Sequence, residues 1–205
     1  MEKKGAILIL SGPSGCGKST LLKKVYKDIN DYYFSISTTT REPRVGEKDG
    51  VDYLFVSKEE FEEDIKNGYF LEWAEVHGNY YGTSLKPIKK ALNKGKLVIF
   101  DIDVQGHEIV RKKLNDIVTS VFITTPTLKE LEQRLNDRNT DTDSVISKRL
   151  DNAKHEIKSF HKYDYFIIND DLEKSSKELV AIANIVRIKA KLFDREEITK
   201  NWLNF

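Results

Sequence analysis

Short runs of apolar residues alternate along the chain with longer segments whose apolar residues recur every three or four positions. The short runs predict buried strands, and the periodic segments predict amphipathic helices between them. Strands are expected at residues 6–10, 33–36, 97–102, 120–124 and 165–168. Helices are expected at about residues 18–28, 105–114, 128–136, 143–159 and 172–189. This alternation is typical of an α/β fold with a mostly parallel sheet.

Residues 37–86 interrupt that alternation. They contain short strand-like pieces at 52–56, 70–76 and 80–84 around one helix near 58–66, which predicts an inserted antiparallel lobe. Two capping boxes mark helix starts, one from Ser57 to Glu60 and one from Thr127 to Glu130. The segment at about 136–143 is polar and poor in large apolar residues, so we expect a mobile loop there.

Residues 12–19 read GPSGCGKS, which matches the phosphate-binding pattern G-x-x-x-x-G-K-[ST] between a predicted strand and a predicted helix. Glycines allow tight left-handed geometry, and the backbone N–H groups then point at an anion at a helix N-terminus. Lys18 is expected to reach the β- and γ-phosphates of a nucleotide, and the Ser19 hydroxyl to ligate Mg²⁺. The alternative is a glycine-rich turn without a ligand.

A carboxylate follows the apolar run 97–100, as a phosphate and magnesium site requires. We expect Asp101 to act on the metal side, with Asp103 on the same face if the strand continues. The alternative is a helix cap or an ordinary loop carboxylate.

Arginines gather at two polar loops, and the guanidinium group makes bidentate bonds to phosphate. The two groups are Arg41 with Arg44, and Arg134 with Arg138 and Arg149.

Composition narrows the class of protein. The 205 residues carry a formal net charge of +1, which argues against a general nucleic-acid or membrane-surface binder. No apolar run approaches the roughly 20 residues that span a bilayer. The first predicted strand starts close to Met1, so we expect no signal peptide. One cysteine excludes an intrachain disulfide, and we expect a cytoplasmic protein. The tail at 193–205 is expected to pack on the core or on a partner.

Several motifs occur together in one order along the chain. They are SGPSGCGKST at 11–20, STTTREPRVGE at 37–47, GVDY at 50–53, FLEW at 70–73, GNYYGT at 78–83, DIDVQG at 101–106, RLNDR at 134–138 and INDD at 168–171. With these motifs the chain resembles the guanylate kinase family over about residues 5–175. The resemblance implies the reaction ATP + GMP ⇌ ADP + GDP with Mg²⁺, and dGMP as a further acceptor.

The resemblance also implies a domain layout and residue roles. The fold would be that of P-loop nucleoside monophosphate kinases: a parallel five-stranded sheet flanked by helices, an inserted mixed α/β lobe that binds GMP, and a small mobile lid. The ATP-binding core would comprise residues 1–36, 87–126 and 150–205, the lobe 37–86 and the lid 127–149.

ATP would contact Gly12, Pro13, Ser14, Gly15, Cys16, Gly17, Lys18, Ser19, Thr20 and Arg134. GMP would contact Ser37, Arg41, Arg44, Glu47, Tyr53, Glu72, Tyr81, Thr83 and Asp103. The transferring group would contact Lys18, Arg41, Arg138 and Arg149, with Mg²⁺ at Ser19 and, through water, Asp101.

Hydrogen-bond chemistry supports the guanine assignment independently. Guanine presents N1–H and a 2-amino group side by side, which a carboxylate such as Glu72 accepts together, while the Thr83 hydroxyl donates to O6. Adenine reverses this pattern, and an unpaired buried carboxylate is costly. The alternative for Glu72 is an ordinary strand charge beside Trp73.

Two other functions remain open from the sequence. Guanylate-kinase-like domains also serve as interaction scaffolds, but those have degraded phosphate loops, whereas Lys18 and Ser19 are intact here. A P-loop phosphotransferase acting on thymidylate, adenylate or a small metabolite is the second alternative, against which Arg41 and Arg44 argue. We expect small-molecule partners only, no nucleic acid or membrane, and a monomer or homodimer.

Overall fold

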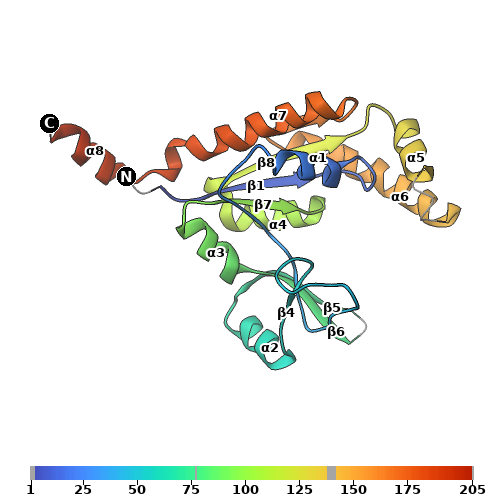
Figure 1. Ribbon diagram of the computed structural model, residues 1–205, viewed down its shortest axis with the longest axis horizontal. Coiled ribbons are helices and arrows are strands. Elements are labelled where there is room, and N and C mark those ends of the chain that lie inside the picture. Colours follow the sequence, from blue (N-terminus) through green and yellow to red (C-terminus); the bar gives the residue numbers. More distant parts are fainter. Residues whose placement is uncertain (1–2, 77, 138–141, 205) are drawn as a thin grey trace.

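The computed structural model describes residues 3–76, 78–137 and 142–204. Its centre is a five-stranded sheet, shown in Figure 1, in which every neighbouring pair of strands is parallel. The strands lie in the order β2 (Tyr32–Phe34), β7 (Leu97–Asp101), β1 (Ala6–Ser11), β8 (Val118–Thr124) and β9 (Tyr165–Ile168). The predicted parallel α/β fold is therefore confirmed.

Alternate residues of β1 belong to two separate apolar layers, because successive side chains of a strand point to opposite faces. Leu8 and Leu10 pack in the layer formed with α1 (Lys18–Val25), α5 (Leu128–Asn136), α6 (Asp143–Glu156) and α7 (Leu172–Ile185). Ile7 and Ile9 pack in the other layer, with α3 (Leu85–Asn93) and α4 (Val104–Leu114). The sheet is thus buried on both faces, as its continuous apolar runs predict.

A second sheet lies below the central one in Figure 1 and forms most of the inserted lobe. Its strands are β4 (Leu54–Phe55), β3 (Thr38–Thr39), β6 (Asn79–Ser84) and β5 (Phe70–Val76), in that order, beside α2 (Lys58–Lys66). The prediction of an antiparallel lobe is only partly right: β6 pairs antiparallel with β3 and β5, but β3 and β4 are parallel.

Most predicted helices form, with differences at their ends. Ser57 and Thr127 cap α2 and α5 as predicted, each accepting a hydrogen bond from the backbone N–H three residues later. α1 ends at Val25, and α6 and α7 pass into short 3₁₀ turns at Ile157–Lys162 and Val186–Ile188. Further 3₁₀ turns span Asn115–Ile117 and Ala190–Leu192. Two helices were not predicted, α3 and α8 (Arg195–Leu203). Residues 138–141 of the expected loop lie outside the described residues.

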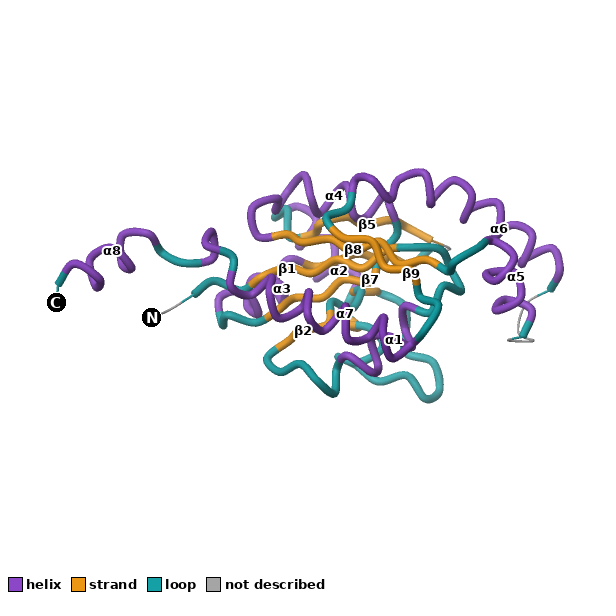
Figure 2. The backbone as a smooth tube through the Cα atoms, turned by 90° about the horizontal axis from the view of Figure 1, so that it is seen from above, coloured by secondary structure: helices purple, strands orange, loops and turns teal. Residues whose placement is uncertain are grey.

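The last helix, α8, projects from the end of the molecule opposite α5 and α6 (Figures 1 and 2). Phe193, just before it, packs against the core, but α8 itself contains no buried residue. Trp202 and Leu203, near the end of α8, are 76% and 65% exposed, so this end of the helix does not pack on the core. No helix among residues 3–76, 78–137 and 142–204 is long and apolar enough to cross a membrane.

Candidate active site

The loop between β1 and α1 has the backbone geometry that its glycines predict. Gly12, Gly15 and Gly17 have φ angles of 145°, 97° and 97°, a region that residues with a side chain rarely adopt. Gly17 is the N-cap of α1 and supplies no side-chain hydrogen bond to the helix. The first N–H groups of α1 therefore face the loop without a side-chain cap, as an anion site at a helix N-terminus requires.

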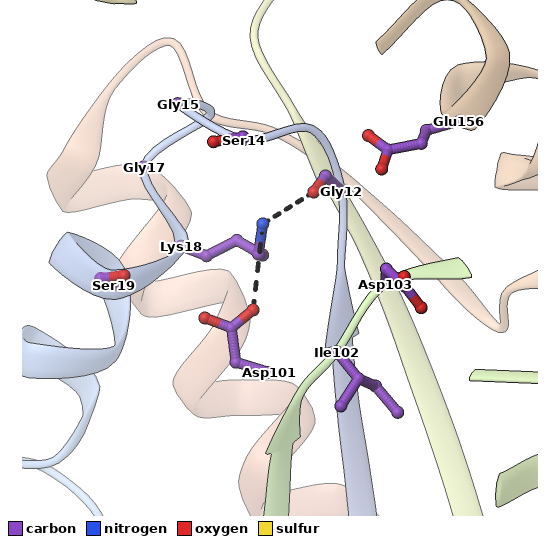
Figure 3. Close-up of a pocket in the computed structure, with 10 residues that line it drawn as sticks. All are labelled: Gly12, Ser14, Gly15, Gly17, Lys18, Ser19, Asp101, Ile102, Asp103 and Glu156. Carbon is purple, nitrogen blue, oxygen red and sulfur yellow. Dashed lines mark hydrogen bonds and ion pairs between the residues drawn. The ribbon is translucent and has the colours of Figure 1, made fainter. Parts of the chain in front are cut away.

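Lys18 lies across this loop (Figure 3). Its Nζ donates hydrogen bonds to Gly12 O at 2.7 Å and to Pro13 O at 3.4 Å, and lies 3.9 Å from Asp101 Oδ1. Burial raises the pKa of the Asp101 carboxyl, and the charge of Lys18 opposes that shift. Lys18, Ser19 and Asp101 line one cavity of about 350 Å³ above the carboxyl ends of β1 and β7.

Two more carboxylates line the same cavity. Asp103 follows β7, and its Oδ1 accepts a 2.8 Å hydrogen bond from Gly106 N in the first turn of α4. Asp103 therefore serves as a helix cap at the rim of the cavity. Glu156 enters from the end of α6, opposite Asp101 (Figure 3), and burial raises the pKa of its carboxyl.

Two of the predicted arginines, Arg149 and Arg134, lie beside the loop. Arg149 Nη1 donates to Ser14 Oγ at 2.9 Å. Arg134 Nη2 donates to Glu130 Oε1 at 2.5 Å and to Asn169 O at 2.8 Å, and it lines a second cavity of about 340 Å³ with Gly15, Gly17 and Thr20. Arg138 lies outside the described residues.

A second cluster lies in the lobe. Arg41 Nη2 donates to both carboxylate oxygens of Glu47, at 2.9 and 3.0 Å, and Glu47 Oε2 also accepts from the backbone N–H of Arg44 at 2.7 Å. These hydrogen bonds raise the pKa of Arg41 and lower the pKa of Glu47. The Arg41 guanidinium lies 5.4 Å from the ring centroid of Tyr53, and Tyr81 packs edge-on against the same ring.

The predicted base-reading residues form a pair on neighbouring strands. Thr83 Oγ1 of β6 donates a 2.6 Å hydrogen bond to Glu72 Oε1 of β5. Glu72 is exposed, and Thr83 is 9% exposed. Ser37 is half-buried just before β3, where its carbonyl accepts from Leu54 N at 2.9 Å.

Comparison with known protein families shows which family this chain belongs to. Residues 4–184 match the family described as guanylate kinase. The chain belongs to the guanylate kinase family. A guanylate kinase of Sulfurimonas denitrificans is 55% identical over 201 residues, which cover 98% of each chain. A guanylate kinase of Campylobacter jejuni is 52% identical over 203 residues, again covering 98% of each.

A solved structure gives the same result for the fold. The crystal structure of guanylate kinase from Anaplasma phagocytophilum superimposes with a TM-score of 0.72 at 32% identity, and covers 100% of this chain and 98% of that one. The parallel sheet, the loop 12–19 and the inserted lobe are thus the parts of a guanylate kinase fold.

Sequence reasoning missed two residues that line the cavities beside the loop. Glu156 is a single carboxylate at a helix end, which no pattern distinguishes. Asn169 lies in a recognised motif but received no role, although its Nδ2 donates to Cys16 O at 2.8 Å and its carbonyl accepts from Arg134. A side chain on Gly17 would collide with that amide, which is a second reason for glycine there.

Proposed function

We propose that this protein transfers the γ-phosphate of ATP to GMP, with Mg²⁺, and accepts dGMP as a second substrate. The reaction of GMP with ATP follows from membership of the guanylate kinase family over nearly the whole chain. The observation that supports the acceptor base is the Glu72–Thr83 pair, whose acceptor and donor atoms lie side by side in the lobe. Guanine offers the complementary donors and acceptor on one edge.

The ATP phosphates would lie in the loop of residues 12–19. The backbone N–H groups bind the phosphates, and Lys18 exchanges its contacts with Gly12 O and Pro13 O for phosphate oxygens. Arg149 already contacts Ser14, so its guanidinium is within reach of the same phosphates. Arg134, Cys16 and Thr20 complete the ATP side, and Arg138 is proposed to join from the lid.

The GMP phosphate would bind at Arg41, beside Glu47, which is also proposed to contact GMP. The planar guanidinium already makes a two-oxygen contact, which a phosphate can reproduce. Glu47 holds the Arg41 guanidinium in place. Arg44, Tyr53 and Tyr81 contribute further donors. Glu72 and Thr83, with Ser37 and Asp103, would read the guanine.

The donor set near Lys18 fits magnesium. Mg²⁺ prefers hard oxygen ligands and in kinases is held by one or two protein oxygens together with phosphates and water. Ser19 and Asp101 line one cavity and offer a hydroxyl and a carboxylate. Ser19 would bind the ion directly, and Asp101 would hold one of its waters. When bound, the ion neutralises charge on the β- and γ-phosphates.

The chemistry needs no covalent protein intermediate. An oxygen of the GMP phosphate attacks the γ-phosphorus, the bond from that phosphorus to the β–γ bridging oxygen breaks, and ADP leaves. Catalysis is mainly positioning and charge neutralisation by Lys18, Arg41, Arg138 and Arg149. Closure of the lobe (residues 37–86) and the lid (127–149) over the core would exclude water, which would otherwise hydrolyse ATP. We place the protein in the cytoplasm as a monomer or homodimer.

An acceptor panel tests this proposal. ADP formation is measured with ATP, Mg²⁺ and either GMP, dGMP, AMP or dTMP. We expect kcat/KM to be highest for GMP, followed by dGMP, with AMP lower by at least about 10²-fold. Highest turnover with AMP or dTMP would assign a different phosphotransferase, and no turnover with any acceptor would favour a scaffold.

A further inference from the structure

The strand that carries Glu72 contains a bulge at that residue. Phe70 pairs with Ser84 and Trp73 with Gly82, so three steps along β5 correspond to two along β6. Leu71 and Glu72 therefore face the single residue Thr83. A bulge leaves part of the ladder unpaired and redirects a side chain, and here it brings Glu72 against the Thr83 hydroxyl at 2.6 Å.

A lysine from the core binds the backbone of this bulge. Lys113, in the last turn of α4, donates from Nζ to Leu71 O at 2.7 Å and to Phe70 O at 3.3 Å. β5 is an edge strand of the lobe sheet, so its outer carbonyls face away from β6 and need partners from elsewhere. Phe70 and Leu71 are buried, at 6% and 4% exposure, whereas the rest of β5 is exposed.

The base of β5 is also part of the core. Leu71 packs in the same apolar layer as Ile9, Val98 and Val110, the last of which lies on α4. The strand is thus held at Leu71 by its side chain and at its carbonyls by Lys113. Glu72 is the first residue beyond this fixed point.

α4 therefore connects Asp103 with the bulge that carries Glu72. Both of these residues are proposed to read the guanine base. Asp103 caps the first turn of α4 through Gly106 N at 2.8 Å, and Lys113 binds the bulge from its last turn. A helix of 11 residues is about 16 Å long and nearly rigid, so it fixes the distance between these two points.

We propose that Lys113 is a positioning residue for guanine recognition, which acts by holding the β5 bulge so that Glu72 is aimed at the base. This inference rests on the proposed function, in which Glu72 reads guanine. Lys113 does not touch the substrate, so its removal changes the affinity for GMP through Glu72 and leaves the ATP side unchanged.

The test compares Lys113→Met, which keeps the aliphatic stem, with Lys113→Arg, which keeps two donors, and with Lys112→Met at the exposed neighbouring position. We expect Lys113→Met to raise the KM for GMP about three- to tenfold and to lower the GMP/AMP selectivity ratio. The KM for ATP should stay within about twofold. Lys113→Arg should restore most of the loss, and Lys112→Met should match the unmodified protein.

A double-mutant cycle separates positioning from a general structural effect. In a Glu72→Gln background, Lys113→Met should have little further effect on the GMP/AMP ratio, because residues that act through one group are not additive. The inference is wrong if the Lys113→Met effect is additive, if Lys113→Met behaves as Lys112→Met, or if both KM values rise together with a lower Tm. Failure of the unmodified protein to prefer GMP over AMP would instead overturn the proposed function.

Discussion

The ammonium of Lys18 lies 3.9 Å from Asp101 Oδ1 while it donates a 2.7 Å hydrogen bond to the carbonyl of Gly12. Both side chains are largely shielded from solvent, with 14% and 23% of their surfaces exposed. These contacts hold the cation over the loop in which the phosphates are proposed to bind. A cation fixed at that position is what electrostatic catalysis requires.

Replacement of Lys18 should abolish most of the activity. Because its charge offsets the charge on the transferring phosphoryl group, Lys18→Ala should lower kcat by at least about 10²-fold. The fold should persist, with a Tm within a few degrees of the unmodified protein. Steady-state kinetics and thermal melts measure both, with Lys23→Ala, an exposed position on α1, as the matched control. Near-normal turnover of Lys18→Ala would refute the assignment of the phosphate site.

Replacement of Glu72 should change selectivity rather than ATP binding. Glu72→Gln cannot accept both N1–H and the 2-amino group of guanine, so the GMP/AMP ratio of kcat/KM should fall by about 10²-fold. The KM for ATP should change little. Glu75→Gln, an exposed position on the same strand, is the control. An unchanged ratio would show that Glu72 does not read the base.

Replacement of Arg41 tests the acceptor phosphate site. Arg41→Lys keeps the charge but loses the planar guanidinium, whose Nη2 contacts both oxygens of Glu47 and whose Nη1 contacts Glu42 O. We expect the KM for GMP to rise by about tenfold and the KM for ATP to stay constant. If the KM values for GMP and ATP rise equally, Arg41 does not bind the GMP phosphate specifically, and its assignment to the acceptor site is wrong.

The charge state of Asp101 links stability to pH. Burial raises the pKa of its carboxyl in the folded protein above the usual value of 3.8. The folded state then binds more protons than the unfolded state between these two pKa values, so this group makes stability fall as pH rises through that interval. Ionised Asp101 is therefore destabilising at neutral pH.

Asp101→Asn should accordingly raise the Tm of the nucleotide-free protein at pH 7 and lower kcat by about tenfold or more, a trade between stability and activity. The gain in Tm should shrink as the pH is lowered toward 3.8, the usual pKa of an aspartate side chain. Thermal melts between pH 4 and 8 measure it. A variant that is less stable than the unmodified protein at pH 7 would show that the pairing with Lys18 outweighs burial.

The sequence predicts the central fold well because β1, β7 and β9 are almost continuous apolar runs and both capping boxes are local. α2, α5 and β5 occupy the predicted residues. α3 was missed although Leu85, Ile88, Ala91 and Leu92 recur at helical spacing and proline is tolerated in a first helical turn. α8 was missed because it buries no face, so no apolar stripe marks it.

The candidate site was predictable where its residues are consecutive. The loop at 12–19 and the Arg41–Glu47 segment each lie within a few residues of sequence. Contacts between distant segments carry no such signal. Lys113 lies 42 residues from Leu71, and Asn169 lies 153 residues from Cys16. The parallel pairing of β3 with β4 was missed for a different reason, because strands of only two residues carry no recognisable pattern.

The most direct test of the proposed transfer of phosphate from ATP to GMP is the product balance of one reaction. The protein is incubated with ATP, GMP and Mg²⁺, and the nucleotides are separated and quantified, with Lys18→Ala run in parallel. GDP and ADP should form in equal amounts with the unmodified protein, and almost none should form with Lys18→Ala. ADP with free phosphate and no GDP, or no products at all, would contradict the proposed transfer.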